Sequence, residues 1–262
     1  MMRALWSAAS GMLAQQLNID TISHNLANVN TTGFKKSRAE FQDLLYQTLR
    51  PAGIPLTRGT NTAVGLQVGV GVRPDAIVKM FTQGSVQVTN NPLDLLIEGS
   101  GFFQVQLVDG TIAYTRDGSL KQDANGDIVT SEGLFVQPQI VIPPEAGRVN
   151  ITAEGKVFAQ LPNQAEQTLV GEIELANFVN TAGLSALGHN LFAATAASGE
   201  PILGIPGQAG FGSIQQGSLE SSNVQVVEEM VNMIMSQRAY EASSKAIQAS
   251  DQMLSLANNL RQ

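Results

Sequence analysis

Four carboxylates are the side chains in this 262-residue chain whose spacing could support catalysis. Asp94 and Glu98, or Asp109 and Asp117, would offer the acid and base that cleave a glycosidic bond. However, Asp109 and Asp117 lie beside glycine or within turn sequences, where aspartate commonly accepts backbone hydrogen bonds. We therefore expect turns and no catalytic residues, and an enzyme acting on a cell-wall glycan is the weaker alternative.

Metal and cofactor chemistry has little sequence support. The run from Asp123 to Asp127 resembles a calcium loop, but Glu132 comes too early to supply its bidentate ligand. The histidines, His24 and His189, lie far apart in sequence, and the absence of cysteine excludes thiolate zinc sites and disulfides. We expect no metal site and no cofactor.

The charge of the chain bears on its partners. The net charge is -7, and Lys35, Lys36 and Arg38 form its only tight basic cluster, which argues against a nucleic-acid partner. No stretch approaches the roughly 18 to 20 apolar residues that span a membrane, so we expect no membrane insertion. Polar residues such as Ser7 and Gln15 interrupt the apolar N-terminus, and we therefore expect it to be retained and not cleaved as a signal peptide.

Glycine and proline divide the chain into helical ends and a different middle. All ten prolines and 24 of the 25 glycines lie from Gly33 to Gly217, leaving Gly11 as the only helix-weakening residue outside this range. We expect one helix from about Met2 to Val29 and another from about Val224 to Leu260.

Both expected helices carry apolar residues at every seventh position, a spacing typical of coiled coils. The N-terminal helix has one row of Leu5, Met12, Ile19 and Leu26 and a second row of Ala8, Gln15, Ile22 and Val29. The C-terminal helix has a row of Val226, Met233, Tyr240, Ile247 and Leu254, beside a row of small and apolar residues that begins at Ala239 and ends at Leu260. We expect the apolar rows to form a self-assembly interface.

The outer helix faces lack the charge of an ordinary solvated surface. Residues 1–34 contain Arg3 and Asp20 as their only formally charged side chains at neutral pH. A two-helix pair cannot bury so much weakly polar surface, which indicates further copies of the chain as partners. Contacts between different patches on successive copies build rings or open filaments, and amides such as Asn18 and Asn25 could set the register between copies. A bundle within one monomer, or a monomeric binding module with a helical stalk, remains the alternative.

The middle of the chain reads as β structure. Asp109-Gly110 between two alternating segments predicts a hairpin, and Asn125-Gly126 and Glu154-Gly155 predict further strand pairs. Leu169 to Val179 offers one more strand, whereas residues 199–217 suggest an irregular extended return. Turn spacing fits an antiparallel sandwich or barrel.

Two elements are expected between the first helix and the β region. A short helix is predicted from Ser37 to Leu49, and Pro51 would end it. Val64 to Val72 alternates apolar residues with Gly65, Gly69, Gly71 and polar residues, which predicts one strand with a bare face. Such a strand would lie flat against a neighbouring element or subunit.

The predicted fold class is therefore α+β. Residues 1–33 and 222–262 would form a discontinuous coiled-coil domain, 34–74 a connecting segment with the short helix and an extended insert, and 75–221 an inserted antiparallel β domain.

Several motifs resemble the axial proteins of the bacterial flagellum, the rod and hook proteins. The strongest is residues 23–35, and it contains the family positions Asn25, Leu26, Ala27, Asn28, Thr31, Gly33, Phe34 and Lys35. Residues 222–224, 228–231 and 237–241 are similar to the family's C-terminal helix, and 99–103 and 114–118 to its β domain. Length and residues 41–74 resemble the distal-rod branch most closely, with the proximal-rod branch as the nearest alternative and a hook-type axial protein as a further one.

This resemblance implies a structural subunit of a helical, tubular homo-oligomer. Implied partners are proximal rod proteins, a hook protein or adaptor, the ring proteins of the peptidoglycan and outer membrane, and the flagellar type III export apparatus. The implied location is the periplasm-spanning rod of the basal body. We further expect the segment containing Gly53, Gly65, Gly69 and Gly71 to fill gaps between subunits and stiffen the polymer.

Overall fold

The computed structural model describes residues 2–51, 55–56, 60–61, 64–161 and 167–259. The chain divides into two compact units. The helical unit comprises Met1–Leu26, Ser37–Val78 and Gln225–Gln262, and the β unit comprises Ala27–Lys36 and Lys79–Val224. The chain therefore passes between the units four times, and the α+β class predicted from the sequence is correct.

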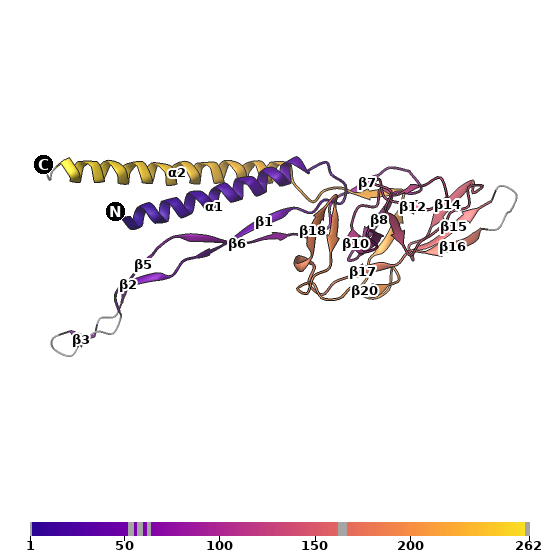
Figure 1. The fold of residues 1–262 in the computed structure, drawn as a ribbon, viewed down its shortest axis with the longest axis horizontal. Helices are drawn as coiled ribbons and strands as arrows, with labels where there is room; N and C mark the ends of the chain where they lie inside the picture. Colours follow the sequence, from indigo (N-terminus) through magenta and orange to yellow (C-terminus); the bar gives the residue numbers. More distant parts are fainter. Residues whose placement is uncertain (1, 52–54, 57–59, 62–63, 162–166, 260–262) are drawn as a thin grey trace. The chain divides into compact units, whose positions relative to one another are not determined.

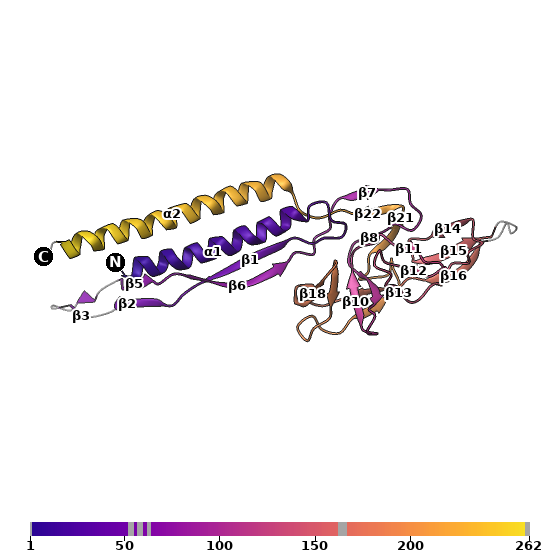
Figure 2. The ribbon, with the colours of Figure 1, turned by 45° about the horizontal axis from the view of Figure 1, so that its top comes forward.

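Two long helices dominate the helical unit. They are α1, Met2–Ala27, and α2, Val226–Asn259, and they run antiparallel beside each other (Figures 1 and 2). Helix α1 ends two residues before the predicted Val29, and a turn follows in which the Thr31 amide donates to the Asn28 carbonyl at 3.2 Å. Glu228 and Glu229 lie in the first turn of α2, where carboxylates favour the positive end of the helix dipole.

Short β pairs complete the helical unit and replace the short helix predicted at Ser37–Leu49. Strand β1 (Ser37–Asp43) pairs with β6 (Val72–Lys79), β2 (Tyr46–Arg50) with β5 (Leu66–Gly69), and β3 (Pro55–Leu56) with β4 (Thr60–Asn61). The helix prediction was wrong because β1 alternates Ala39 and Phe41 with charged and amide residues. That two-residue period, together with a partner strand, outweighs helix propensity.

The strand predicted from Val64 to Val72 is also divided. Residues 70 and 71 separate β5 from β6, and Gly71 has φ of +127°, which an L side chain rarely adopts. This glycine therefore ends one strand pair and starts the next, so a single bare-faced strand does not form.

Sixteen strands are described in the β unit, and all their pairings with a defined register are antiparallel. They are β7 (Val86–Val88), β8 (Leu95–Glu98), β9 (Phe102–Gln106), β10 (Ile112–Thr115), β11 (Lys121–Gln122), β12 (Ile128–Val129), β13 (Phe135–Gln137), β14 (Arg148–Ile151), β15 (Lys156–Gln160), β16 (Thr168–Glu172), β17 (Leu175–Asn177), β18 (Ser185–Gly188), β19 (Leu191–Ala193), β20 (Ile202–Gly204), β21 (Ser213–Gln216) and β22 (Ser218–Glu220). A 3-10 turn, η1, covers Thr181–Gly183.

The largest sheet has nine strands among the described residues. Its path is β11-β12-β13-β9-β10-β19-β18, and β17 joins β9 to β20. Smaller sheets are β14-β15-β16, β8-β21 and β7-β22. The strand pairs predicted at Asp109-Gly110, Asn125-Gly126 and Glu154-Gly155 are confirmed as β9-β10, β11-β12 and β14-β15.

Two β-region predictions need correction. Leu169–Val179 holds two strands, β16 and β17, which belong to different sheets. Residues 199–217 are not an irregular return, because β20 pairs with β17 and β21 pairs with β8. Turn glycines near these short strands concealed them, since partners distant in sequence supply their hydrogen bonds.

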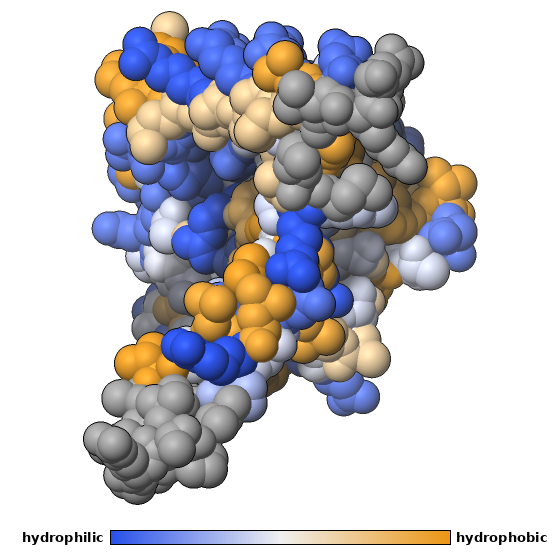
Figure 3. Space-filling view, turned by 90° about the vertical axis from the view of Figure 1, so that its left-hand side faces the viewer, coloured by the Kyte–Doolittle hydropathy of each residue, from blue (hydrophilic) through white to orange (hydrophobic). Residues whose placement is uncertain are grey.

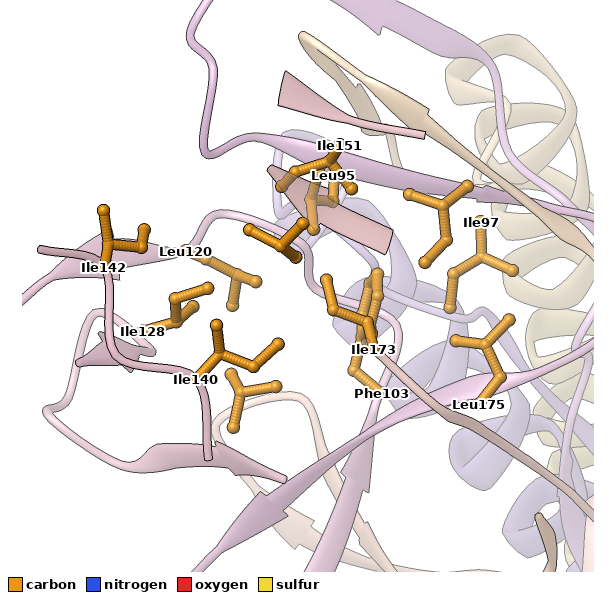
Figure 4. Close-up of a cluster of buried hydrophobic side chains, with 13 residues drawn as sticks. Leu95, Ile97, Phe103, Leu120, Ile128, Ile140, Ile142, Ile151, Ile173 and Leu175 are labelled. Carbon is orange, nitrogen blue, oxygen red and sulfur yellow. The ribbon is translucent and has the colours of Figure 1, made fainter. Parts of the chain in front are cut away.

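The interior of the β unit is a closed aliphatic core (Figure 4). Phe103, Val157 and Leu175 are fully buried members of this core, and Ile, Leu and Val side chains from several sheets complete it. A second cluster is aromatic, where Tyr114 and Phe178 meet edge to face with ring centroids 4.8 Å apart. Together these clusters give the β unit a well-packed core of its own.

Candidate functional site

The contact between α1 and α2 is a helix seam of small and polar residues. Asn18 Nδ2 donates to Ser236 Oγ at 2.8 Å, and Asn25 Nδ2 donates to Glu229 Oε2 at 3.3 Å. One heptad before Asn18, a Cβ added to Gly11 would lie 3.4 Å from Ser243 Oγ. Steps of seven along both helices therefore fix one antiparallel register, and two of the amides expected to act between copies bond within this chain.

The predicted apolar rows flank this seam. Ile22 is buried, and Val226 and Tyr240 are exposed. The partly buried members are Leu5, Met12, Ile19, Leu26, Val29, Met233, Ile247 and Leu254. One chain therefore leaves much of these rows half covered, and their role between copies stays a prediction.

Exposed apolar stripes cover the outer faces of both helices. On α1, Trp6 and Leu13 are 72% and 68% exposed, and on α2 Val227 is 76% exposed. A second stripe on α2 has heptad spacing and consists of Met235, Ala242, Ala249 and Leu256, all exposed. Figure 3 shows hydrophobic residues open to solvent at the end of the helical unit that contains the start of α1 and the end of α2. We call the exposed apolar residues named in this paragraph, together with Val231 of α2, which is 51% exposed, the outer stripes.

The strand pairs of the helical unit contact α1 through a glycine. The amide of Val72 donates to Ser10 Oγ at 3.3 Å, and a Cβ on Gly71 would overlap that oxygen. Gly69 lies beside the Tyr46 ring, and a Cβ there would be 3.5 Å from the ring, an ordinary contact. Gly65 is partly exposed, and Gly53 lies outside the described residues.

A buried ion cluster lies inside the β unit. Lys35 Nζ contacts Glu220 Oε1 at 2.5 Å, and Arg116 Nη1 lies 3.4 Å from Glu220 Oε2. Lys35 also donates to the Thr82 carbonyl at 2.8 Å, and the Gly84 amide donates to Glu220 Oε1 at 2.8 Å. One carboxylate thus serves two buried cations and a backbone amide.

Burial and the charge of Glu220 act in opposite directions on the two cations. Burial lowers the pKa of both Lys35 and Arg116, although the charge of Glu220 acts in the opposite direction. Arg116 donates to the Gly99 carbonyl at 2.7 Å, and its guanidinium carbon lies 5.4 Å from the Phe102 ring centroid. Within the described residues, its buried Nε has no hydrogen-bond partner.

Asn223 joins three segments beside this cluster. Its Oδ1 accepts from the Lys36 amide at 2.7 Å, and its Nδ2 donates to the Met80 carbonyl at 2.8 Å. The Met80 amide in turn donates to the Lys36 carbonyl at 2.8 Å. We call Lys35, Arg116, Glu220 and Asn223 the arm junction.

The aspartates proposed for catalysis mostly form turns. Asp109 Oδ1 accepts from the amide and hydroxyl of Thr111, and these bonds lower the pKa of Asp109. Asp117 accepts from the Ser119 amide, and Asp123 of the run that resembles a calcium loop accepts from the Ala124 amide. Asp94 accepts from the Asn91 side chain instead.

Polar residues also line a small pocket of the β unit. Its volume is about 190 Å³, and it includes Asp117, Glu132 and His189. His189 lies 3.5 Å from Glu132, and both side chains are exposed. Across the described ranges, no group of three or more His, Asp or Glu residues could hold a metal ion, and neither described helix is long and apolar enough to cross a membrane.

Three family profiles match the chain. "Flagella basal body rod protein" matches residues 5–35, "Flagellar hook protein FlgE/F/G D1 domain" matches 96–159, and "Flagellar basal body rod FlgEFG protein C-terminal" matches 215–260. The flagellar basal-body rod protein FlgG of Borreliella burgdorferi is 55% identical over 263 residues, covering 100% of this chain and 99% of that protein. The chain belongs to the flagellar rod and hook protein family.

Two further relatives show how the similarity to rod proteins differs from the similarity to a hook protein. FlgG of Buchnera aphidicola subsp. Acyrthosiphon pisum is 50% identical, covering 99% of this chain and 100% of that protein. The flagellar hook protein FlgE of Helicobacter mustelae is 48% identical over 138 residues, covering 52% of this chain and 30% of that protein. Similarity therefore extends over the full length of the rod proteins but over a minor part of the hook protein.

The family motif of residues 25–35 contributes to both units. In the helical unit, Asn25 Nδ2 donates to the Ser37 carbonyl and its Oδ1 accepts from the Ser37 amide, both at 2.8 Å. In the β unit, Gly33 has φ of +67°, and a Cβ there would lie 2.7 Å from the Asp117 amide nitrogen. Phe34 lies beneath Lys79, whose Nζ is 5.2 Å from the ring centroid, and Lys35 enters the arm junction.

Sequence reasoning missed three members of the arm junction. Arg116 and Asn223 lie within motifs that carried the rod and hook resemblance, but Glu220 lies in none of them. For Arg116 and Asn223 the available signal was their place in these motifs, and for Glu220 no local signal was present. Their mutual pairing could not be read from spacing, because 104 residues separate Arg116 from Glu220.

Proposed function

We propose that this chain is a structural subunit of the flagellar distal rod that self-assembles into a rigid helical tube. The tube would act as a drive shaft that carries motor torque to the hook. Full-length similarity to flagellar basal-body rod proteins supports this role, whereas similarity to the hook protein covers 30% of that protein. A proximal rod subunit is the nearest alternative within the family.

The exposed outer stripes are the observation that supports self-assembly. Trp6, Leu13 and Val227 are more than two-thirds exposed, and apolar residues continue along α2 at heptad spacing. Contiguous apolar surface of this kind marks an interaction site. Because the stripes differ from the helix seam, they would meet different patches on other copies, and such heterologous contacts propagate into a helical polymer.

The half-covered apolar rows would complete the helical packing in the polymer. Neighbouring helices would cover Met12, Ile19, Met233 and Ile247 and the other members of those rows. This arrangement would make the discontinuous helical domain a coiled coil with contributions from several chains. The polar helix seam within one chain would then set register, and apolar contacts between chains would supply most of the stabilisation.

The position of the polymer defines its further partners. We propose contacts with proximal rod proteins at one end and with a hook protein or adaptor at the other. Ring proteins of the peptidoglycan and outer membrane would surround the tube, which would span the periplasm after passage through the flagellar type III export apparatus without signal-peptide cleavage.

The strand pairs of the helical unit would stiffen the tube. Gly71 allows the strand pairs to contact α1 at Ser10, and Leu45 and Tyr46 of the same region remain exposed. These exposed residues, with the segment around Gly53, Gly65 and Gly69, would fill gaps between subunits. Deleting residues 49–59 should give tubes that bend, as measured by persistence length in electron micrographs. Unchanged persistence length would refute the stiffening role.

A charge in an outer stripe provides the main test of assembly. Val231→Glu places a carboxylate on the exposed face of α2, where burial against another copy would require its desolvation. We expect the concentration needed for polymerisation to rise at least about tenfold, with little change in monomer stability. Sedimentation over a concentration series, with electron microscopy of the pellet, measures both the threshold and the polymer form.

Val108→Glu is the matched control, because Val108 is 98% exposed in a turn of the β unit. This variant should polymerise like the parent chain. Equal thresholds for Val231→Glu and the parent would reject the outer stripes as the assembly surface. Activity on peptidoglycan that Asp94→Ala or Asp117→Ala abolishes would instead support the enzyme alternative.

A further inference from the structure

The arm junction gathers the segments through which the chain passes between its two units. The N-terminal arm, residues 27–36, enters and leaves the β unit, and the C-terminal arm, residues 218–224, leads into α2. A third segment, from Lys79 to Gly84, follows the last strand of the helical unit. All three segments hydrogen-bond to one another inside the β unit.

Glu220 in the C-terminal arm is the electrostatic centre of this junction. It pairs with Lys35 of the N-terminal arm at 2.5 Å and with Arg116 at 3.4 Å. Its Oε1 also accepts from the Gly84 amide. Removing this carboxylate would leave two cations buried without it, and a buried charge that loses its partner is strongly destabilising. Burial of Lys35 therefore depends on Glu220, a residue of the other arm.

Backbone contacts strengthen the connection between the arms. The Gly33 amide donates to the Glu220 carbonyl at 2.8 Å, and the Lys36 amide donates to Asn223 Oδ1 at 2.7 Å. Gly33 must be glycine because its φ is positive and a Cβ would contact the backbone of Asp117. The C-terminal arm thus supplies the hydrogen-bond acceptors for two backbone amides of the N-terminal arm.

We propose that the arm junction couples the ordering of the two arms, so that the N-terminal and C-terminal arms dock into the β unit together. Glu220 is the positioning residue of this device. By linkage, any interaction that orders one arm also favours the ordered form of the other. A neighbouring molecule that contacts only one terminal helix would therefore stabilise the attachment of both. The inference concerns the single chain and does not depend on polymer formation.

Native-state hydrogen exchange of the full-length chain at dilute concentration tests the coupling. In Glu220→Gln, we expect the Gly33 and Lys36 amides of the N-terminal arm to exchange at least about 100-fold faster, because breaking a buried ion pair has effects of that size. The Phe103 and Val105 amides in the core should stay within about twofold of the parent, since arm opening precedes global unfolding. Glu200→Gln removes an exposed carboxylate of the β unit and should change none of these rates.

Lys35→Met tests the reverse direction and remains informative if Glu220→Gln does not fold. This variant keeps the Glu220–Arg116 pair and removes the excess cation, so it should fold. We expect its Ser221 amide, which donates to the Ser85 carbonyl at 2.9 Å, to exchange at least about fivefold faster although the substitution lies in the other arm. In the double variant that combines Glu220→Gln and Lys35→Met, the fold-increase in exchange rate should be smaller than the product of the two single fold-increases.

Independent behaviour of the arms would overturn the proposal. That result would be faster exchange only at Ser221 in Glu220→Gln, with Gly33 and Lys36 unchanged, or strictly multiplicative effects in the double variant. An equal increase in the exchange rates of the Phe103 and Gly33 amides would also overturn it. The substitution would then lower the stability of the whole chain and would not open the arms separately. None of these exchange rates depends on whether the chain polymerises.

Discussion

The two units of this molecule differ in how they cover their hydrophobic residues. The β unit closes an aliphatic core around Phe103 and Leu175, both fully buried. The helical unit joins α1 to α2 through Asn18 and Asn25 and leaves Trp6 and other apolar residues in solvent. The β unit thus buries its apolar residues within one chain, whereas the helical unit leaves exposed an apolar surface of the kind that marks an interaction site.

Core truncation should give the largest contrast between the units. We expect Phe103→Ala to lower the free energy of unfolding by about 3–5 kcal/mol, since a closed core cannot collapse around the cavity. Ile22→Ala in α1 should lower it by less than about 2 kcal/mol, because thin layers near solvent relax more easily. Urea unfolding followed by circular dichroism measures both values. Equal losses would mean that the helical unit is as closely packed as the β unit.

Glycine substitution sharpens the comparison within the β unit. Gly33→Ala should cost about 2–3 kcal/mol in unfolding free energy, because its left-handed conformation is strained and the new Cβ would meet the Asp117 backbone. Gly199→Ala is the matched control, with φ of +80° and nothing within 4 Å of an added Cβ. It should cost about 1 kcal/mol. Similar losses in thermal unfolding would show that Gly33 is needed for its conformation alone.

The polar helix seam explains why the helical unit should be weak in one chain. Asn18→Leu replaces an amide by an apolar side chain, and Ser236 keeps its bond to the Asn232 carbonyl. We expect cleavage of the helices by a dilute protease to slow about two- to fivefold, equivalent to roughly 0.5–1 kcal/mol. Gln16→Leu, on the exposed side of α1, should leave the rate unchanged. Faster cleavage of Asn18→Leu would show that the hydrogen bond outweighs apolar contact.

The smallest effect concerns pH. Burial lowers the pKa of Lys35 below its ordinary 10.5, so the folded chain releases this proton at lower pH than the unfolded chain. Between the two values the unfolded chain binds more protons, and the free energy of unfolding therefore rises with pH. The free energy of unfolding of the parent chain minus that of Lys35→Met should therefore increase as pH approaches 10.5. Urea titrations at several pH values measure this difference. A decrease would mean that Glu220 outweighs burial.

Local patterns in the sequence predicted much of the fold. The distribution of glycine and proline located α1 and α2 because helices tolerate neither residue well, and Asp109-Gly110 located a hairpin because its turn needs a positive φ. The segment at Ser37–Leu49 failed because its apolar residues fit a helix nearly as well as a strand. The later partner strands decide between them, since β6 pairs with β1 and β5 pairs with β2.

The sites were predictable to a smaller extent. Heptad spacing identified the helices that carry exposed apolar residues, but not that Gly11, Asn18 and Asn25 would form the seam. Helical spacing permits several adjacent rows, and the choice depends on the partner helix. The arm junction could not be predicted, because Lys35 and Glu220 are 185 residues apart and nothing in either local sequence specifies the other.

The pairing of β7 with β22 has a consequence for how such chains can vary. Residues 89–217 leave and return through this one strand pair, since the Thr89 amide donates to the Gly217 carbonyl at 2.9 Å. The two ends of that long segment are therefore fixed next to each other, whatever lies between them. A segment with adjacent ends can be enlarged or shortened in its loops, while Arg116 and the Asp117 backbone keep their contacts with the arms. Variation within residues 89–217 can then accumulate without altering the terminal helices, for which we propose contacts with other copies of the chain.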